Sequence, residues 1–143
     1  MPAYRKVFKG LDPSYVRNEA ELQMVAAKFG LSPKVLGTDY KTFIEMEEIE
    51  NMNVGDWYGE DIKDIPPHIL SAMWSLLWML YHVCGIAYID VWPRNFVEKN
   101  GRVWIIDFGD AYELKYTDSE EPDHYLDEIL KAGKITHWNP EFL

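Results

Sequence analysis

Three polar residues in the second half of the chain have side chains and a spacing that suit the transfer of a phosphoryl group. Asp90 lies five residues before Asn95, and Asp107 follows Asn95 by 12 residues, directly before Phe108-Gly109. An apolar run, Val103-Trp104-Ile105-Ile106, leads into Asp107 and predicts a strand that ends at this carboxylate. Phosphoryl transfer depends on oxygen ligands for Mg²⁺ and on a group that orients the attacking hydroxyl. Two carboxylates and one amide can supply both.

The segments that hold these residues resemble the catalytic loop and the metal-binding loop of the protein kinase-like superfamily. Tyr88-Ile-Asp90-Val-Trp-Pro-Arg-Asn95 is similar to H-R-D-L-x-x-x-N, and Asp107-Phe-Gly109 is similar to D-F-G. The resemblance implies the use of ATP with Mg²⁺ or Mn²⁺. It implies that Asp90 accepts the proton of the attacking hydroxyl or orients it, that Asp107 binds the metal bridging the β- and γ-phosphates, and that Asn95 binds a second metal. The alternative is that Asp90 and Asn95 are turn residues and Asp107 only ends a strand.

The same resemblance implies a lysine–glutamate pair that grips the α- and β-phosphates of ATP. Glu19, early in the first predicted helix, matches the family's glutamate best, and Glu21 is the fallback. For the lysine, Val7-Phe8-Lys9 resembles the family's strand motif, so Lys9 is favoured over Lys6. The alternative for Lys9 is an ordinary surface lysine.

Residues 43–49 resemble the strand that leads into the adenine-binding hinge of the superfamily. Backbone groups hold the base there, in an apolar slot with a few placed polar contacts. By this match Met46 lies at the back of the slot, and the carbonyl of Glu47 and the amide of Ile49 face adenine.

The elements that must position these residues are predicted from hydrophobic periodicity and turn residues. Helices are expected at about residues 15–29, 67–84 and 122–132. Strands are expected at residues 4–9, 33–36, 42–46 and 103–106, with a tight turn at Asn100-Gly101. The resemblance implies a single α+β domain with a protein kinase-like fold. Its reduced small lobe, residues 1–48, has a short antiparallel sheet and one helix, and its reduced large lobe, residues 49–143, is mainly helical.

The chain departs from the superfamily in three ways. No G-x-G-x-x-G loop, which covers the nucleotide phosphates in protein kinases, precedes the predicted lysine strand. Tyr88 and Ile89 replace the His and Arg before the catalytic Asp, and no A-P-E motif follows Gly109. In these respects the chain is more similar to compact atypical kinases, such as the RIO-type, the tRNA-modification-associated, and the aminoglycoside or lipopolysaccharide kinases. Its size suggests a viral or phage genome.

The composition predicts a folded and strongly acidic protein. Of the 143 residues, 48% are hydrophobic and 15% aromatic, which is enough for a packed core. Because the net charge is −10, nucleic acid is not expected as a partner, whereas a basic protein or a cationic small molecule would be attracted. The single cysteine, Cys84, and the lack of a signal-like or membrane-spanning run predict a soluble intracellular protein, in the cytoplasm, or in the host cytoplasm or nucleus if viral.

Three functions are compatible with the sequence. The first is a minimal phosphotransferase that moves the γ-phosphoryl to a hydroxyl, most plausibly of a protein Ser or Thr. The second is a pseudokinase that docks a partner, favoured by the missing phosphate-covering loop; the third is a small-molecule kinase. Two strands of the family's small lobe are missing together with the Gly-rich loop. Because their absence would expose apolar surface, a homodimer or a partner is expected to complete the small lobe. The acidic segment Asp118–Asp123 would either order over the site or stay mobile.

Overall fold

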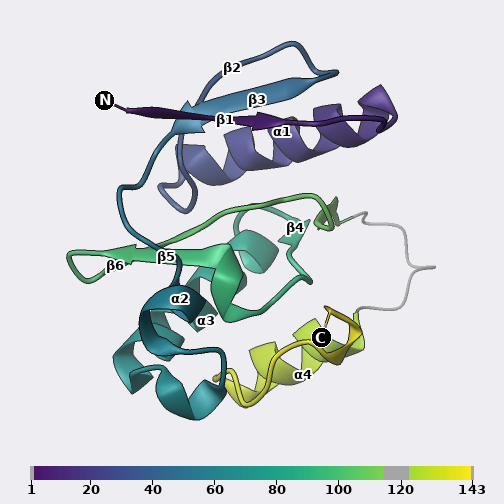
Figure 1. Ribbon diagram of the computed structural model, residues 1–143. Helices are drawn as coiled ribbons and strands as arrows, with labels where there is room; N and C mark the ends of the chain where they lie inside the picture. The colour runs from purple at the N-terminus through teal and green to yellow at the C-terminus, as the bar shows by residue number, and fades with distance from the viewer. Residues whose placement is uncertain (1, 115–122, 143) are drawn as a thin grey trace.

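The computed structural model describes residues 2–114 and 123–142 (Figure 1). All of the predicted acidic segment except Asp123, and the predicted start of the last helix at Pro122, lie outside the described residues. The described chain forms four α-helices and antiparallel sheets of three, two and two strands. The predicted α+β fold class is therefore confirmed. Of the helices in these two ranges, none combines the length and the apolarity that crossing a membrane requires.

The N-terminal part is a three-stranded antiparallel sheet with one helix along its face (Figure 1). The strands pair in the order β1-β3-β2, so β1 is an edge strand. A small core of its own lies between helix and sheet. The elements are β1 (Ala3–Val7), α1 (Pro13–Lys28), β2 (Val35–Thr38) and β3 (Phe43–Glu47). The buried residues of this core are Val16, Ala20, Ile44 and Met46.

Helix α1 begins at an aspartate cap and ends before a glycine. The Asp12 side chain accepts a hydrogen bond from the Ser14 amide (2.8 Å), and Pro13 occupies the first turn, where its φ is already helical. After the helix, Gly30 adopts a φ of 74°, which glycine reaches without a Cβ clash. The helix starts two residues before the predicted boundary because the proline belongs to its first turn.

Strand β1 is shorter than predicted, and this decides where its two lysines lie. The strand ends at Val7, so Lys9 lies beyond it and is exposed. Side chains alternate between the two faces of a strand. This alternation places Lys6 on the same face as Tyr4, whereas Lys9, past the last residue of the strand, is not placed by it. In the register of the sheet, Lys6 lies opposite Ile44 of the buried strand β3.

The rest of the described chain is built around α3, whose inner face forms the centre of the larger core. The predicted turn at Asn100-Gly101 is confirmed, with φ values of 54° and 81°. The Trp74 indole donates to the Ile129 carbonyl (2.8 Å) and so ties α3 to α4. The elements are α2 (Val54–Tyr58), α3 (Pro67–His82), β4 (Ile86–Ala87), β5 (Phe96–Lys99), β6 (Arg102–Ile105), β7 (Tyr112–Glu113) and α4 (His124–Ala132), with 3₁₀ turns η1 (Ile62–Asp64), η2 (Pro93–Asn95) and η3 (Pro140–Phe142).

The residues after α4 form a segment that packs back onto the molecule. The Trp138 indole is buried and donates to the Glu60 carbonyl (2.7 Å). The Tyr125 hydroxyl of α4 donates to the His137 carbonyl (2.7 Å). The segment thus connects α4 with the turn between α2 and η1.

Candidate functional site

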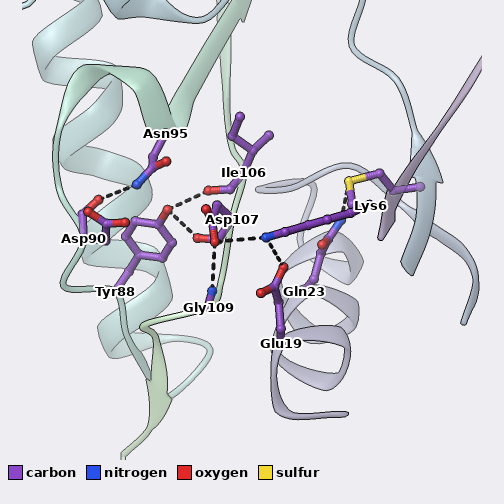
Figure 2. Close-up of polar contacts among 10 residues, drawn as sticks. Lys6, Glu19, Gln23, Tyr88, Asp90, Asn95, Ile106, Asp107 and Gly109 are labelled. Carbon is purple, nitrogen blue, oxygen red and sulfur yellow. Dashed lines mark hydrogen bonds and ion pairs between the residues drawn. The ribbon is translucent and has the colours of Figure 1, made fainter. Parts of the chain in front are cut away.

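The loop between β4 and η2 positions Asp90. The Val91 amide donates to the Ile89 carbonyl (2.8 Å), which closes a three-residue turn centred on Asp90. The Asn95 side-chain amide donates to the Asp90 backbone carbonyl (2.8 Å). Figure 2 shows the nitrogen of Asn95 turned toward Asp90 and its oxygen on the other side. Asp90 and Asn95, predicted from their spacing, are therefore held together by direct contact.

The environment of Asp90 favours its protonated form more than water does. Partial burial raises the pKa of the Asp90 carboxyl; the Asn95 side chain opposes this, and the negative charges of Asp107 and Asp110 add to it. A raised pKa makes the ionised carboxylate a stronger proton acceptor, as the role of a general base requires.

Asp107 follows β6 in a backbone conformation that few residues other than glycine adopt. Its φ is 64°, which costs about 1–3 kcal/mol for a residue with a side chain. The conformation turns the carboxylate back over the following turn, where Oδ1 accepts from the Gly109 amide (3.0 Å). The same oxygen accepts from the Lys6 ammonium (3.2 Å). Asp107 is therefore a fixed carboxylate at the end of an apolar strand, as its sequence context predicted.

A buried tyrosine, whose role sequence reasoning missed, holds the strained segment. The Tyr88 hydroxyl lies 2.6 Å from the Ile106 carbonyl and 2.7 Å from the Asp107 carbonyl, so its single proton is shared between them (Figure 2). Burial, reinforced by nearby carboxylates including Asp107, raises the pKa of Tyr88 well above its usual value. Its ring packs edge-on against Phe108, with centroids 5.4 Å apart. Tyr88 thus couples the loop of Asp90 to the loop of Asp107.

The structure pairs Glu19 with Lys6, not with Lys9 as the sequence favoured. The Lys6 ammonium lies 2.7 Å from Glu19 Oε2 and 3.2 Å from Asp107 Oδ1, between helix α1 and the end of β6 (Figure 2). Lys9 does not take this place: it lies past the end of β1 and is exposed. The fallback Glu21 is exposed and pairs with Arg17 (3.5 Å).

Burial and the opposite charge of the partner act in opposite directions on the pKa values of Lys6 and Glu19. Burial alone lowers the pKa of the Lys6 ammonium, but the carboxylates of Glu19 and Asp107 more than offset this, so the pKa is raised. Glu19 is only 3% exposed. Burial raises the pKa of its carboxyl, and the Lys6 ammonium opposes that shift. The Lys6 ammonium therefore favours the ionised form of this carboxyl, against the effect of burial.

A cleft of about 400 Å³ lies between the sheet and the loops below it. The hinge residues predicted from the sequence, Met46, Glu47 and Ile49, all line this cleft together with Lys6 and Asp107. Other residues that the sequence did not single out line it as well, among them Tyr4 of β1 and Val97 of β5. For Tyr4, the sequence signal would have been the alternation of side chains along the strand, which places Tyr4 on the same face as Lys6.

The donor set of the cleft fits a hard cation bound together with phosphates. No three His, Cys, Asp or Glu side chains of residues 2–114 and 123–142 gather to hold a metal by themselves. Mg²⁺, however, is usually bound by one or two protein carboxylates plus substrate phosphates. Asp107 has one oxygen, Oδ1, bonded to Lys6 and Gly109, and its other oxygen is available. The amide oxygen of Asn95, a buried residue that does not itself line the cleft, is the second candidate donor.

The comparisons with known proteins agree with this arrangement at the level of the superfamily. The chain is 30% identical over 117 residues to a protein of Archaeoglobus fulgidus described as a probable serine/threonine-protein kinase BUD32 homolog. The match covers 80% of this chain and 55% of the relative, so the chain spans about half the length of the curated relative it matches. No family model matches the chain. The similarity supports the protein kinase-like superfamily and does not select a RIO-type or lipopolysaccharide-kinase subfamily.

Proposed function

We propose that the chain is a kinase-like phosphotransferase that uses ATP with Mg²⁺ or Mn²⁺ and transfers the γ-phosphoryl to a protein Ser or Thr hydroxyl. The observation that carries this proposal is the Lys6 ammonium, which lies between Glu19 and Asp107 at the wall of the cleft. A lysine held in this way presents its positive charge to the space where phosphates would bind. The similarity to a probable serine/threonine kinase supports the same reaction.

In this proposal, each of the five polar residues in and around the cleft has one task. Lys6 grips the α- and β-phosphates, and Glu19 holds the ammonium in place. Asp90 accepts or orients the proton of the acceptor hydroxyl, and its raised pKa favours that task. Asp107 and Asn95 would hold the metal, which supplies neutralisation of the charge that develops on the phosphates.

The binding of the adenine base and the choice of acceptor are proposed from the hinge residues and the net charge. Met46 closes the back of an adenine slot, with the Glu47 carbonyl and the Ile49 amide facing the base. The amides of Glu47 and Glu48 already donate to the Lys34 and Pro2 carbonyls (2.9 and 3.1 Å). Because the net charge is −10, a basic protein is the acceptor best attracted to the surface.

The test is transfer of labelled γ-phosphate from Mg-ATP to generic basic proteins, with nucleotide binding followed in the same samples. Asp107→Asn and Asp90→Ala are each expected to lower transfer by about 10²-fold or more while the fold is kept. Asp110→Asn removes one negative charge beside the site, from a residue given no catalytic task, and is the matched control. Robust transfer by Asp107→Asn would contradict the assignment of the metal ligand.

A second function, a nucleotide-binding docking module, is favoured by one observation. Strand β1 is an edge strand, and Tyr4 on it is 51% exposed although it lines the cleft. Phosphates bound there would be poorly shielded from water, which slows transfer. A partner, or a second copy of the chain, would then cover the sheet edge. Nucleotide binding without transfer to any acceptor would favour this function.

A further inference from the structure

We propose that Asn139, in the segment after α4, is a positioning residue for Asp90. This inference rests on the proposed function, because it concerns the geometry of the group that accepts the acceptor's proton. Asn139 is far from Asp90 in sequence and 1% exposed. It belongs to no sequence motif identified above, and only the structure brings it to the loop.

Asn139 binds the backbone on both sides of Asp90. Its side-chain amide donates to the Ile89 carbonyl (2.7 Å), and its backbone amide donates to the Val91 carbonyl (3.2 Å). The Ile89 carbonyl also closes the three-residue turn around Asp90 by accepting from the Val91 amide (2.8 Å). One residue therefore holds the carbonyl of the residue before Asp90 and the carbonyl of the residue after it.

Asn95 completes the same set of contacts from within the loop. Its side chain donates to the Asp90 carbonyl (2.8 Å), and its backbone amide donates to the Trp92 carbonyl (3.1 Å). Four successive carbonyls, of residues 89–92, are thus all bonded, two by Asn139 and two by Asn95. A backbone with every carbonyl engaged has little freedom to turn the Asp90 side chain.

Asn139 is itself held firmly enough to serve as a support. Its side-chain oxygen accepts from the Glu141 amide (3.1 Å), and its backbone carbonyl accepts from the Phe142 amide (3.1 Å). The neighbouring Trp138 indole anchors the segment to the Glu60 carbonyl (2.7 Å). Glu60 also accepts from Arg94 of the loop (2.7 Å). The segment therefore reaches the loop directly through Asn139, and indirectly through Trp138 and Glu60.

The expected effect is on the chemical step and not on nucleotide binding. Asn139 does not line the cleft that holds Lys6 and Asp107. A small misplacement of a catalytic group costs rate because the reacting atoms no longer meet in line. Loss of the Asn139 side-chain donor should therefore lower kcat and leave the KM for ATP unchanged.

Two variants of the same segment separate positioning from general stability. Asn139→Asp keeps the shape but turns the donor facing the Ile89 carbonyl into an acceptor. Trp138→Phe removes the bond to Glu60 and keeps both Asn139 bonds to the Asp90 loop. We expect Asn139→Asp to lower kcat about 10-fold to 100-fold, with the nucleotide Kd within about twofold, while Trp138→Phe lowers the Tm and keeps kcat. An unchanged kcat in Asn139→Asp, or equal losses in both variants, would overturn the proposal.

Hydrogen exchange of the loop amides gives a readout that needs no transfer. The Val91 and Asn95 amides should exchange faster in Asn139→Ala than in the wild type, and faster than in Trp138→Phe. Equal protection of these amides in Asn139→Ala and the wild type would show that Asn139 does not hold the loop. A wild type that transfers no phosphate would count against the proposed function alone, because the exchange result still decides whether Asn139 braces Asp90.

Discussion

At the scale of single residues, the site depends on a few side chains in costly environments. Glu19 is a buried carboxylate whose charge is balanced by Lys6, and an unpaired buried charge costs several kcal/mol. Asp107 holds a left-handed backbone conformation. Such strained residues persist when the surrounding structure over-determines them, and the Tyr88 hydroxyl and the Lys6 ammonium do so here. The cost is explained if these groups act together on a ligand.

The first prediction separates the two lysines of the N-terminal segment. Lys6→Ala should lower kcat/KM for ATP by about 10²-fold, because it removes the positive charge held by Glu19 and Asp107. Lys9→Ala, on an exposed residue past the end of β1, should change it less than about twofold. The measurement is steady-state kinetics with ATP varied. The reverse ranking would return the clamp to Lys9.

The second prediction concerns pH. Asp90 must be ionised to accept a proton, so activity should fall as the pH falls through its pKa, which burial raises above the usual Asp value of 3.8. The acid limb of the pH–rate profile should therefore lie above the range of an ordinary Asp. Asp110→Asn removes a like charge that contributes to the shift and should move the limb to lower pH. A limb that stays in place in this variant would contradict the electrostatic account.

At the scale of elements, two loops and one edge strand meet at the cleft. The loop after β4 and the loop after β6 share the Tyr88 hydroxyl, so they cannot shift independently. Strand β1 brings Lys6 from the opposite wall, and its only partner in the sheet is β3. The wall formed by the two loops is therefore joined by hydrogen bonds, whereas the wall formed by β1 is held by β3 alone among the described strands.

Tyr88→Phe should disturb the wall formed by the two loops, because it leaves the Ile106 and Asp107 carbonyls without their buried donor. The free energy of unfolding should fall by about 1–3 kcal/mol, and transfer should fall with it. Tyr125→Phe removes a similar bond, to the His137 carbonyl, and should affect stability alone. Urea unfolding and transfer assays on both variants check this. Full transfer by Tyr88→Phe would show that the shared hydroxyl is dispensable for the site.

Tyr4 gives a prediction about the wall formed by β1. Its ring lies in the cleft opposite Met46 in the register of the sheet, so a nucleotide base can stack against it. Tyr4→Ala should raise the Kd for ATP about tenfold and leave the Kd for inorganic triphosphate unchanged, whereas Tyr4→Phe should bind ATP normally. Tyr15→Ala, on an exposed tyrosine of α1, is the control. Equal losses for ATP and triphosphate would exclude stacking.

At the scale of the whole molecule, the limit of sequence reasoning is contact between distant segments. The structure brings Asp90 into contact with Asn95, and Glu19 and Asp107 into contact with Lys6; their spacing within short segments was enough to select these four residues as candidates. Lys9 was favoured over Lys6 because a pattern of three residues does not fix where a strand ends. Asn139 could not have been found, since its partners lie some fifty residues earlier and its signal is a hydrogen bond, not a motif.

The acidic surface predicts how the acceptor is selected. With a net charge of −10, transfer to a basic peptide should have a KM that rises steeply with ionic strength, because salt screens the attraction. A peptide with the same Ser or Thr in an acidic context should be a much poorer acceptor. The KM for both peptides, measured across a salt series, checks this. A salt-independent KM for the basic peptide would favour an uncharged contact.

The order of the strands along the chain has a consequence for how the protein folds. The β2–β3 hairpin is local, turned by Asp39, whose carboxylate accepts from the backbone amides of Thr42 and Phe43. Strand β1 instead pairs with β3 across the whole of α1 and β2, so its docking must wait for a long loop to close. During synthesis, the strand with Lys6 emerges before its partner exists. The clamp lysine would therefore be among the last groups to reach its place.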